Sequence, residues 1–272
     1  MARAEDGRPT SSLDMFVTCS KAIADGVLIK RVSQQDKEFH FQNWVGSRLD
    51  DARLNHDSSG RNSYPDFTLV DFPEGYEVKG LAVPGREASY DSNSRVPSGL
   101  HNGRTVFYVF GRYPAKIDEE SYPVIDLVVC HGDFLNADHE YVHKNRSFRG
   151  FGSYGDILVR DRKMYVAPTP FALTEGTTGK QTLIVPADYT VNDPRLDVVG
   201  ELTRVEADSI AVGYSFDLTT NSLEPRTIEN PTAKVKHSFV AYRRSGIGQG
   251  AVTLRAKPIL EVPSDDEGEG DS

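Results

Sequence analysis

Two carboxylates and one lysine stand close together in the first third of the chain. Asp66 follows Pro65 directly. Eleven positions further on, Glu77 and Lys79 flank Val78. Residues two apart in a strand point to the same side, so Glu77 and Lys79 would share one face while Val78 points into apolar packing. A turn at residues 71–75, between the two segments, would bring Asp66 back beside them.

Such a group suits the hydrolysis of a phosphodiester. Carboxylate oxygens are hard ligands for Mg²⁺, which proteins hold through one or two carboxylates while positions stay open for water and phosphate. The metal polarises the phosphoryl group and lowers the pKa of a bound water. A lysine can orient that water or neutralise the charge that develops on the phosphate. We therefore expect Asp66 and Glu77 to bind Mg²⁺, with Lys79 as the third catalytic residue.

The pattern Pro65-Asp66 with Glu77-Val78-Lys79 resembles the motif of the PD-(D/E)xK nuclease superfamily, most closely its type II restriction endonucleases. The resemblance implies a mixed α/β (α+β) fold with a restriction-endonuclease-like core. In that core a central mixed sheet is led by the metal-binding hairpin and flanked by helices. In many such enzymes a glutamate on the preceding helix assists the metal, and Glu38 is the candidate here.

The same resemblance implies a function. It predicts a Mg²⁺-dependent endonuclease that hydrolyses double-stranded DNA at specific sites, acts as a homodimer, and has a cognate DNA methyltransferase encoded nearby. Other nucleases on the same core remain open, namely repair, resolvase, transposase-associated or modification-dependent enzymes. A non-catalytic DNA-binding subunit of a defence complex is a further alternative, because one core can carry several functions.

The elements expected around the motif are helices first and strands afterwards. Apolar spacing predicts helices over residues 11–31 and 34–54. Short apolar runs bounded by turn residues predict strands at 66–70, 76–79, 106–110 and 124–129, followed by 156–159, 183–185, 210–216 and 239–242. We expect three parts, which are a nuclease core with N-terminal helices at 1–175, a β-rich subdomain for DNA recognition or dimerisation at 176–263, and a disordered acidic tail at 264–272.

A polar segment from Gly80 to Arg104 follows the predicted catalytic strand. Its side chains could read base edges or clamp phosphates, although a plain polar connection has the same composition. The residues expected to contact DNA are Arg86, Ser92, Asn93, Arg95, Ser98, His101 and Arg104. A second basic and aromatic segment, between His139 and Tyr165, also has the mix of a nucleic-acid surface.

Composition and charge limit the classes of protein that remain. The chain has 272 residues, of which 38% are hydrophobic, so wholesale disorder is excluded. The formal charge of −9 excludes a uniformly basic, non-specific nucleic-acid binder. Leaving out the five acidic residues of the tail changes it to −4, and residues 224–258 are locally basic, so a basic cleft is compatible with an acidic total.

The N-terminal sequence and the two cysteines indicate the compartment in which we expect the protein. The N-terminal residues lack the apolar core of a signal peptide, and no segment is apolar for long enough to cross a bilayer, so we expect a cytoplasmic protein without membrane contact. Cys19 and Cys130 are expected to be buried small hydrophobes, because two cysteines alone cannot form a structural zinc cluster.

Overall fold

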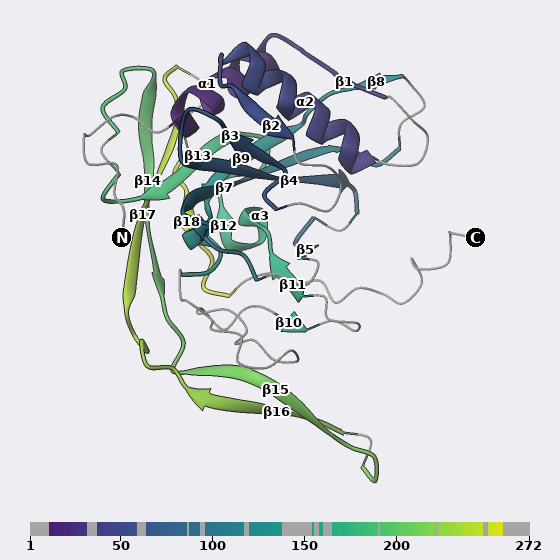
Figure 1. Cartoon of the computed structure of the whole chain (residues 1–272), viewed down its shortest axis with the longest axis vertical. Coiled ribbons are helices and arrows are strands. Elements are labelled where there is room, and N and C mark those ends of the chain that lie inside the picture. Colours follow the sequence, from purple (N-terminus) through teal and green to yellow (C-terminus); the bar gives the residue numbers. More distant parts are fainter. Residues whose placement is uncertain are drawn as a thin grey trace.

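A computed structural model of the chain, shown in Figure 1, is built around one large sheet. It describes residues 11–31, 37–58, 64–85, 87–92, 96–116, 120–137, 154, 158–159, 165–189, 191–220, 222–246 and 250–257. The expected acidic tail and almost all of the basic and aromatic segment after His139 lie outside the described residues. No helix in the described part is long and apolar enough to span a membrane.

The central sheet has nine strands of mixed direction. Its order is β14-β17-β13-β9-β7-β4-β3-β2, and β6 pairs with β7 beside this path. Two neighbouring pairs are parallel, β4 with β7 and β9 with β13, and the others are antiparallel. The strands are β2 (His56–Ser58), β3 (Phe67–Leu69), β4 (Glu74–Val83), β6 (Leu100–His101), β7 (Arg104–Pro114), β9 (Asp126–His131), β13 (Gln181–Pro186), β14 (Leu196–Val205) and β17 (Lys236–Arg244).

Two helices, α1 (Ser11–Ala24) and α2 (Lys37–Asp51), cover one face of this sheet (Figure 1). Phe16 of α1 and Phe41 of α2 are fully buried against it, in one cluster with Val78 of β4. The expected helix 11–31 is wrong in its second half. The helix stops at Ala24, Gly26 takes a positive φ of 74°, and β1 (Ile29–Lys30) then pairs with β8 (Ser121–Tyr122).

The other face of the sheet is covered by short elements. These are α3 (Pro170–Leu173), a small sheet of β5 (Ser89–Asp91), β10 (Leu158–Val159) and β11 (Tyr165–Pro168), and the pair β12 (Thr174–Glu175) and β18 (Thr253–Leu254). Phe110 of β7 and Cys130 of β9 are fully buried beneath them. The strands β7 and β9 are therefore covered on both faces, as expected from their continuous apolar runs. Both cysteines are buried, which confirms that expectation.

Other helices in the described part are short. They are α3 and the 3₁₀ turn η1 (Gly132–Phe134), so no helix comparable with α1 or α2 follows the β3–β4 hairpin there. The crossover from β4 to the parallel strand β7 contains β5 and β6 instead. The architecture is a mixed α+β fold with few helices. The predicted boundary at residue 175 stays a prediction, although strands from both sides of it share the central sheet.

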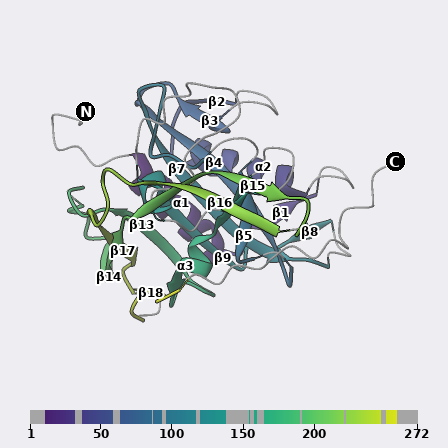
Figure 2. The ribbon, with the colours of Figure 1, turned by 90° about the horizontal axis from the view of Figure 1, so that it is seen from below.

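A long hairpin arm leaves one end of the sheet. Strands β14 and β17 run on into β15 (Ser209–Asp217) and β16 (Ser222–Glu229), which pair with each other in a separate two-stranded sheet. Figure 1 shows this ribbon extending below the body of the molecule, and Figure 2 shows the same ribbon from below, crossing in front of the sheet. The strands expected at 183–185, 210–216 and 239–242 are confirmed as β13, β15 and β17.

Candidate active site

The predicted hairpin forms, and its register aligns the motif residues. Strand β3 pairs antiparallel with β4, with Phe67 opposite Tyr76 and Thr68 opposite Gly75. One step further along the same register, Asp66 comes opposite Glu77. The carboxylate of Asp66 accepts a hydrogen bond of 2.8 Å from the backbone N–H of Val78. Asp66 is thus held against the strand that carries the other two residues.

The boundaries of the two strands differ from the expected ones. Strand β3 is shorter than 66–70, and Val70 is exposed after its end. Strand β4 is much longer than 76–79, because it pairs with β7 over ten residues from Glu74 to Val83. The expected turn at 71–75 is therefore wrong at its end, since Glu74 and Gly75 already belong to β4.

Glu77 and Lys79 lie on one face of β4, as their spacing predicts. The Lys79 Nζ atom lies 2.9 Å from Glu77 Oε1, and the two side chains are only 16% and 12% exposed. Val78 between them is buried in the cluster with α1 and α2, so Glu77 and Lys79 point to the face away from the helices. Burial makes this pair less screened by solvent than a surface ion pair.

The second carboxylate oxygen of Glu77 is the unusual atom in the site. Oε2 is buried and has no hydrogen-bond partner among the described residues. An unpaired buried carboxylate oxygen is costly, and native proteins normally satisfy such groups with a donor or a cation. A hard cation at this position would satisfy it. Asp66 and Glu77 therefore fit the carboxylate ligation that Mg²⁺ uses.

Two tyrosines lie beside this group that sequence analysis did not single out. Tyr108 of β7 is the register partner of Glu77 across the β4–β7 pair. Its hydroxyl lies 2.8 Å from the hydroxyl of Tyr64. Burial, helped by the nearby Tyr64, Tyr90 and Glu77, raises the pKa of Tyr108 well above its ordinary value, so this hydroxyl stays neutral. The only signal in the sequence is the position of Tyr64 directly before Pro65.

The predicted DNA-contact residues have mixed outcomes. Arg86, Asn93 and Arg95 lie outside the described residues, and Ser92 is half-buried after β5. The Ser98 hydroxyl donates to Leu100 O at 2.7 Å and so closes a local turn. The His101 ring packs edge-on against Tyr64, with the ring centroids 5.0 Å apart.

Arg104 has a structural role in addition to any role with DNA. Its Nη1 group donates to Leu69 O at 2.8 Å and to Phe72 O at 3.1 Å. These carbonyls lie at the end of β3 and in the following turn, so Arg104 ties the hairpin to β7. Both carbonyls are inside the segment that orients Asp66 and Glu77.

The remaining metal candidate, Glu38, lies at the start of α2, and its side chain is outside the described part of the structure. Within the part that is described, no group of three or more His, Cys, Asp or Glu residues is arranged to hold a metal ion. Asp66 bonds the backbone N–H of Val78, the residue after Glu77, so the two carboxylates of the motif come from adjoining segments of the hairpin. A pair is sufficient for Mg²⁺, which keeps several waters.

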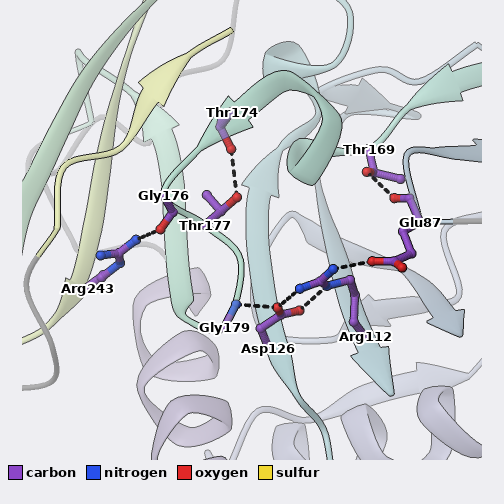
Figure 3. Close-up of polar contacts among 9 residues, drawn as sticks. All are labelled: Glu87, Arg112, Asp126, Thr169, Thr174, Gly176, Thr177, Gly179 and Arg243. Atoms are coloured by element: carbon purple, nitrogen blue, oxygen red, sulfur yellow. Dashed lines mark hydrogen bonds and ion pairs between the residues drawn. The ribbon is translucent and has the colours of Figure 1, made fainter. Parts of the chain in front are cut away.

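A second buried polar network lies further along the same strands (Figure 3). Arg112 of β7 donates from Nε to Asp126 Oδ1 at 2.8 Å and from Nη2 to Asp126 Oδ2. The same Asp126 oxygen also accepts the Gly179 N–H at 2.6 Å. Arg112 Nη1 bonds Glu87, whose carbonyl accepts from Thr169. Both oxygens of Asp126 are satisfied, so this network ties elements together and presents no unpaired carboxylate oxygen of Asp126.

One basic residue of the segment 224–258, Arg243, does not belong to the protein surface. Arg243 is buried, donating to Gly250 O at 2.9 Å and to the carbonyl of Gly176. That guanidinium holds two loops and is not presented to a ligand.

Comparison of the chain with protein-family models, with curated proteins and with solved structures found no match.

Proposed function

We propose that the chain is a Mg²⁺-dependent endonuclease of the PD-(D/E)xK type with a restriction-endonuclease-like core. Its substrate would be double-stranded DNA, cut by phosphodiester hydrolysis. The observation that carries the proposal is the buried Oε2 of Glu77, which has no hydrogen-bond partner in the described part of the chain, in a hairpin that also holds Asp66 and Lys79. The motif alone could occur by chance, but a surface hairpin would leave its glutamate solvated.

Each residue has a distinct task in this proposal. Asp66 and Glu77 would hold the cation, which supplies Lewis-acid polarisation of the phosphate and acidification of a water. The Asp66 oxygen that accepts the Val78 N–H keeps that carboxylate in a set orientation. Lys79 would orient the attacking water and offset negative charge on the phosphate in the transition state.

The neighbouring tyrosines limit water and charge around the reacting atoms. Tyr108 remains protonated because its pKa is raised, so it can donate a hydrogen bond without adding a second negative charge beside Glu77. Tyr64 and His101 form an edge-to-face pair next to it. Ser98 and His101 belong to the connection that we propose to face the DNA, together with Arg86, Ser92, Asn93 and Arg95.

The direct test is metal-dependent cleavage of unmethylated plasmid and phage DNA by the purified full chain. Wild type should give discrete fragments with Mg²⁺ and none with EDTA. Glu77→Gln and Lys79→Ala should each reduce cleavage by about 100-fold or more, because each removes a group used in the transition state. Discrete fragments would indicate a restriction enzyme, and structure-dependent nicking would indicate a repair or resolvase enzyme.

The matched controls come from an exposed acid and lysine pair on α1. Lys21 Nζ and Asp25 Oδ2 form an ion pair whose side chains are 65% and 52% exposed. Asp25→Asn and Lys21→Ala should leave cleavage unchanged. Full activity in Lys79→Ala, or equal loss in the control variants, would reject the proposed site. Calorimetry with Mn²⁺ in the absence of DNA separates a failure to bind metal from a failure to bind DNA.

A further inference from the structure

The chain crosses over strand β4 directly before the motif. Pro65 lies against Gly75, which has no side chain, and a Cβ atom on Gly75 would come within 2.5 Å of Pro65 Cγ. Gly75 and Glu77 are two positions apart in β4, so they share one face of the strand. The segment Tyr64–Pro65 therefore passes over the face of the sheet that carries Glu77.

The hydroxyl of Tyr64 reaches the next strand, β7. It lies 2.8 Å from the hydroxyl of Tyr108, which is fully buried. Tyr108 is the register partner of Glu77, and side chains at paired positions of neighbouring strands point to the same face. Two residues after Tyr64, the Asp66 carboxylate accepts the Val78 N–H of β4. The segment that carries Asp66 is thus fastened to β7 through a hydroxyl and to β4 through a carboxylate oxygen.

The same tyrosine also contacts the connection that precedes β7. Its ring packs edge-on against the ring of His101, with the centroids 5.0 Å apart. Its hydroxyl donates a long hydrogen bond of 3.4 Å to the carbonyl of Ser98. His101 belongs to β6, which pairs with the start of β7. One side chain therefore contacts both the motif-bearing part of the sheet and the connection at residues 98–101.

We propose that Tyr64 is a positioning residue of the metal site. Its hydroxyl, anchored on Tyr108, sets where the Asp66 carboxylate stands relative to Glu77. Its ring holds the connection with His101 against the same hairpin. This inference rests on the Mg²⁺ site of the proposed function. Groups that orient a metal ligand from behind are important for binding, and their loss typically lowers metal affinity or activity by about 10–100-fold.

Calorimetry with Mn²⁺ on the full-length chain, without DNA, tests the hydroxyl apart from cleavage. Tyr64→Phe removes the hydroxyl and keeps the ring, and should raise the Kd for Mn²⁺ by about tenfold or more. Tyr108→Phe should have the same effect, because it removes the other half of the same bond. The double variant should bind Mn²⁺ no more weakly than either single variant, since two groups that act as one unit are not additive.

The matched control is Tyr242→Phe. Tyr242 on β17 is also buried, but it packs in the cluster on the face that the helices cover. Loss of its hydroxyl should leave the Kd for Mn²⁺ unchanged. Urea denaturation of the same variants separates positioning from folding, because a role confined to folding would lower the urea midpoint of Tyr64→Phe without changing its Kd for Mn²⁺.

Cleavage kinetics test the ring. Tyr64→Phe should lower the single-turnover rate constant and leave the DNA concentration for half-maximal rate within about twofold, because the ring on His101 is kept. Tyr64→Leu removes the ring as well and should also raise that concentration. Equal half-maximal concentrations in the two variants would overturn the part of the proposal that concerns the ring.

The outcomes distinguish this inference from the proposed function. A wild-type chain that binds no Mn²⁺ rejects the metal site, and the positioning role with it. Wild-type binding together with equal binding by Tyr64→Phe rejects only the positioning role. Losses that add in the double variant also reject it, because the two hydroxyls would then act separately. If the Tyr64 variants do not fold, Tyr108→Phe compared with Tyr242→Phe decides the role of the hydroxyl pair.

Discussion

Two buried carboxylates on the central sheet have opposite kinds of surroundings. Asp126 on β9 is fully buried, and both of its oxygens accept hydrogen bonds, from Arg112 and from the Gly179 amide (Figure 3). Glu77 on β4 has one oxygen beside Lys79 and one that is buried and unpaired among the described residues. Both residues lie on strands of one sheet, but of the two carboxylates it is Glu77 that has an oxygen without a partner among the residues that the structure describes.

The difference separates carboxylates that hold the fold from one that is available for a ligand. Asp126 pairs with Arg112 and links β7, β9 and the loop at Gly179. The cost of removing its charge from water is therefore offset by bonds within the protein. The desolvation cost of Glu77 Oε2 is not offset by any hydrogen bond from the described residues. Such unsatisfied groups are expected at functional sites, where a metal or substrate completes the interaction.

The largest effect should come from breaking the satisfied pair. Asp126→Asn leaves Arg112 with a neutral partner in a buried position, and removing one member of a buried pair typically costs about 3–5 kcal/mol. We expect a loss near 3 kcal/mol in the free energy of unfolding, measured by urea denaturation, because Glu87 still contacts the guanidinium. A loss below about 1 kcal/mol would contradict the structural role.

Glu77→Gln should reduce cleavage strongly and stability little, whereas Asp126→Asn should reduce stability. The amide oxygen can still accept from Lys79, and the pair lies at a partly open site, so the free energy of unfolding should change by about 1 kcal/mol or less. Cleavage should fall by about 100-fold or more, equivalent to about 2.7 kcal/mol of transition-state stabilisation. Metal-induced thermal stabilisation should disappear with it. If Glu77→Gln instead loses stability in proportion to activity, Glu77 would be a structural carboxylate like Asp126.

A third carboxylate, Glu74, is intermediate between the two, because it is hydrogen-bonded but strongly desolvated. Burial raises its pKa to about 6, against the lowering effect of hydrogen bonds from Ser11 and Ser12 at the start of α1. The unfolded chain therefore ionises Glu74 at lower pH than the folded chain does. Its contribution to stability falls as pH rises from about 4.5 to about 6 and stays low above that.

Glu74→Gln removes this pH dependence. Relative to wild type, the variant should gain up to about 2 kcal/mol of unfolding free energy between pH 4 and pH 7.5, as obtained by urea denaturation at both values. Glu201→Gln, at an exposed position of β14, is the matched control and should show no such difference. A gain of the opposite sign would mean that the ionised form of Glu74 is the stabilising one.

The smallest effect is expected at the exposed pair Lys21 and Asp25. Solvent screens this pair, so Asp25→Asn should change the free energy of unfolding by about 0.5 kcal/mol or less. Raising the salt concentration should remove even that change. A larger loss would show that exposure is a poor guide to which ion pairs matter in this fold.

Local residue types predicted several elements well. The apolar runs at 106–110 and 124–129 are the doubly covered strands β7 and β9, and the hairpin that carries Asp66 and Glu77 is present. The first and last residues of the helices and strands were less predictable. Strand β4 begins at Glu74 because pairing with β7 extends it, and α1 ends at Ala24 where Gly26 adopts a positive φ. These limits depend on distant strands and on backbone conformation.

Roles of charged residues were predictable only in part. The spacing of Glu77 and Lys79 placed both on one face, because strand periodicity is local. Arg104 and Arg243, in contrast, are committed to backbone carbonyls, and no local pattern distinguishes them from arginines that face a ligand. The buried state of Glu74 and the satisfied state of Asp126 are likewise results of packing.

By itself, the amino-acid sequence determined which chemical groups could meet and the periodicity that places them on one side of a strand. Only the tertiary structure decided which of these groups are satisfied. Hydrogen bonding and desolvation depend on partners far apart in the chain, such as Gly179 for Asp126 and Ser11 for Glu74. That Glu77 Oε2 is buried without a partner among the described residues can therefore be seen only in the assembled sheet.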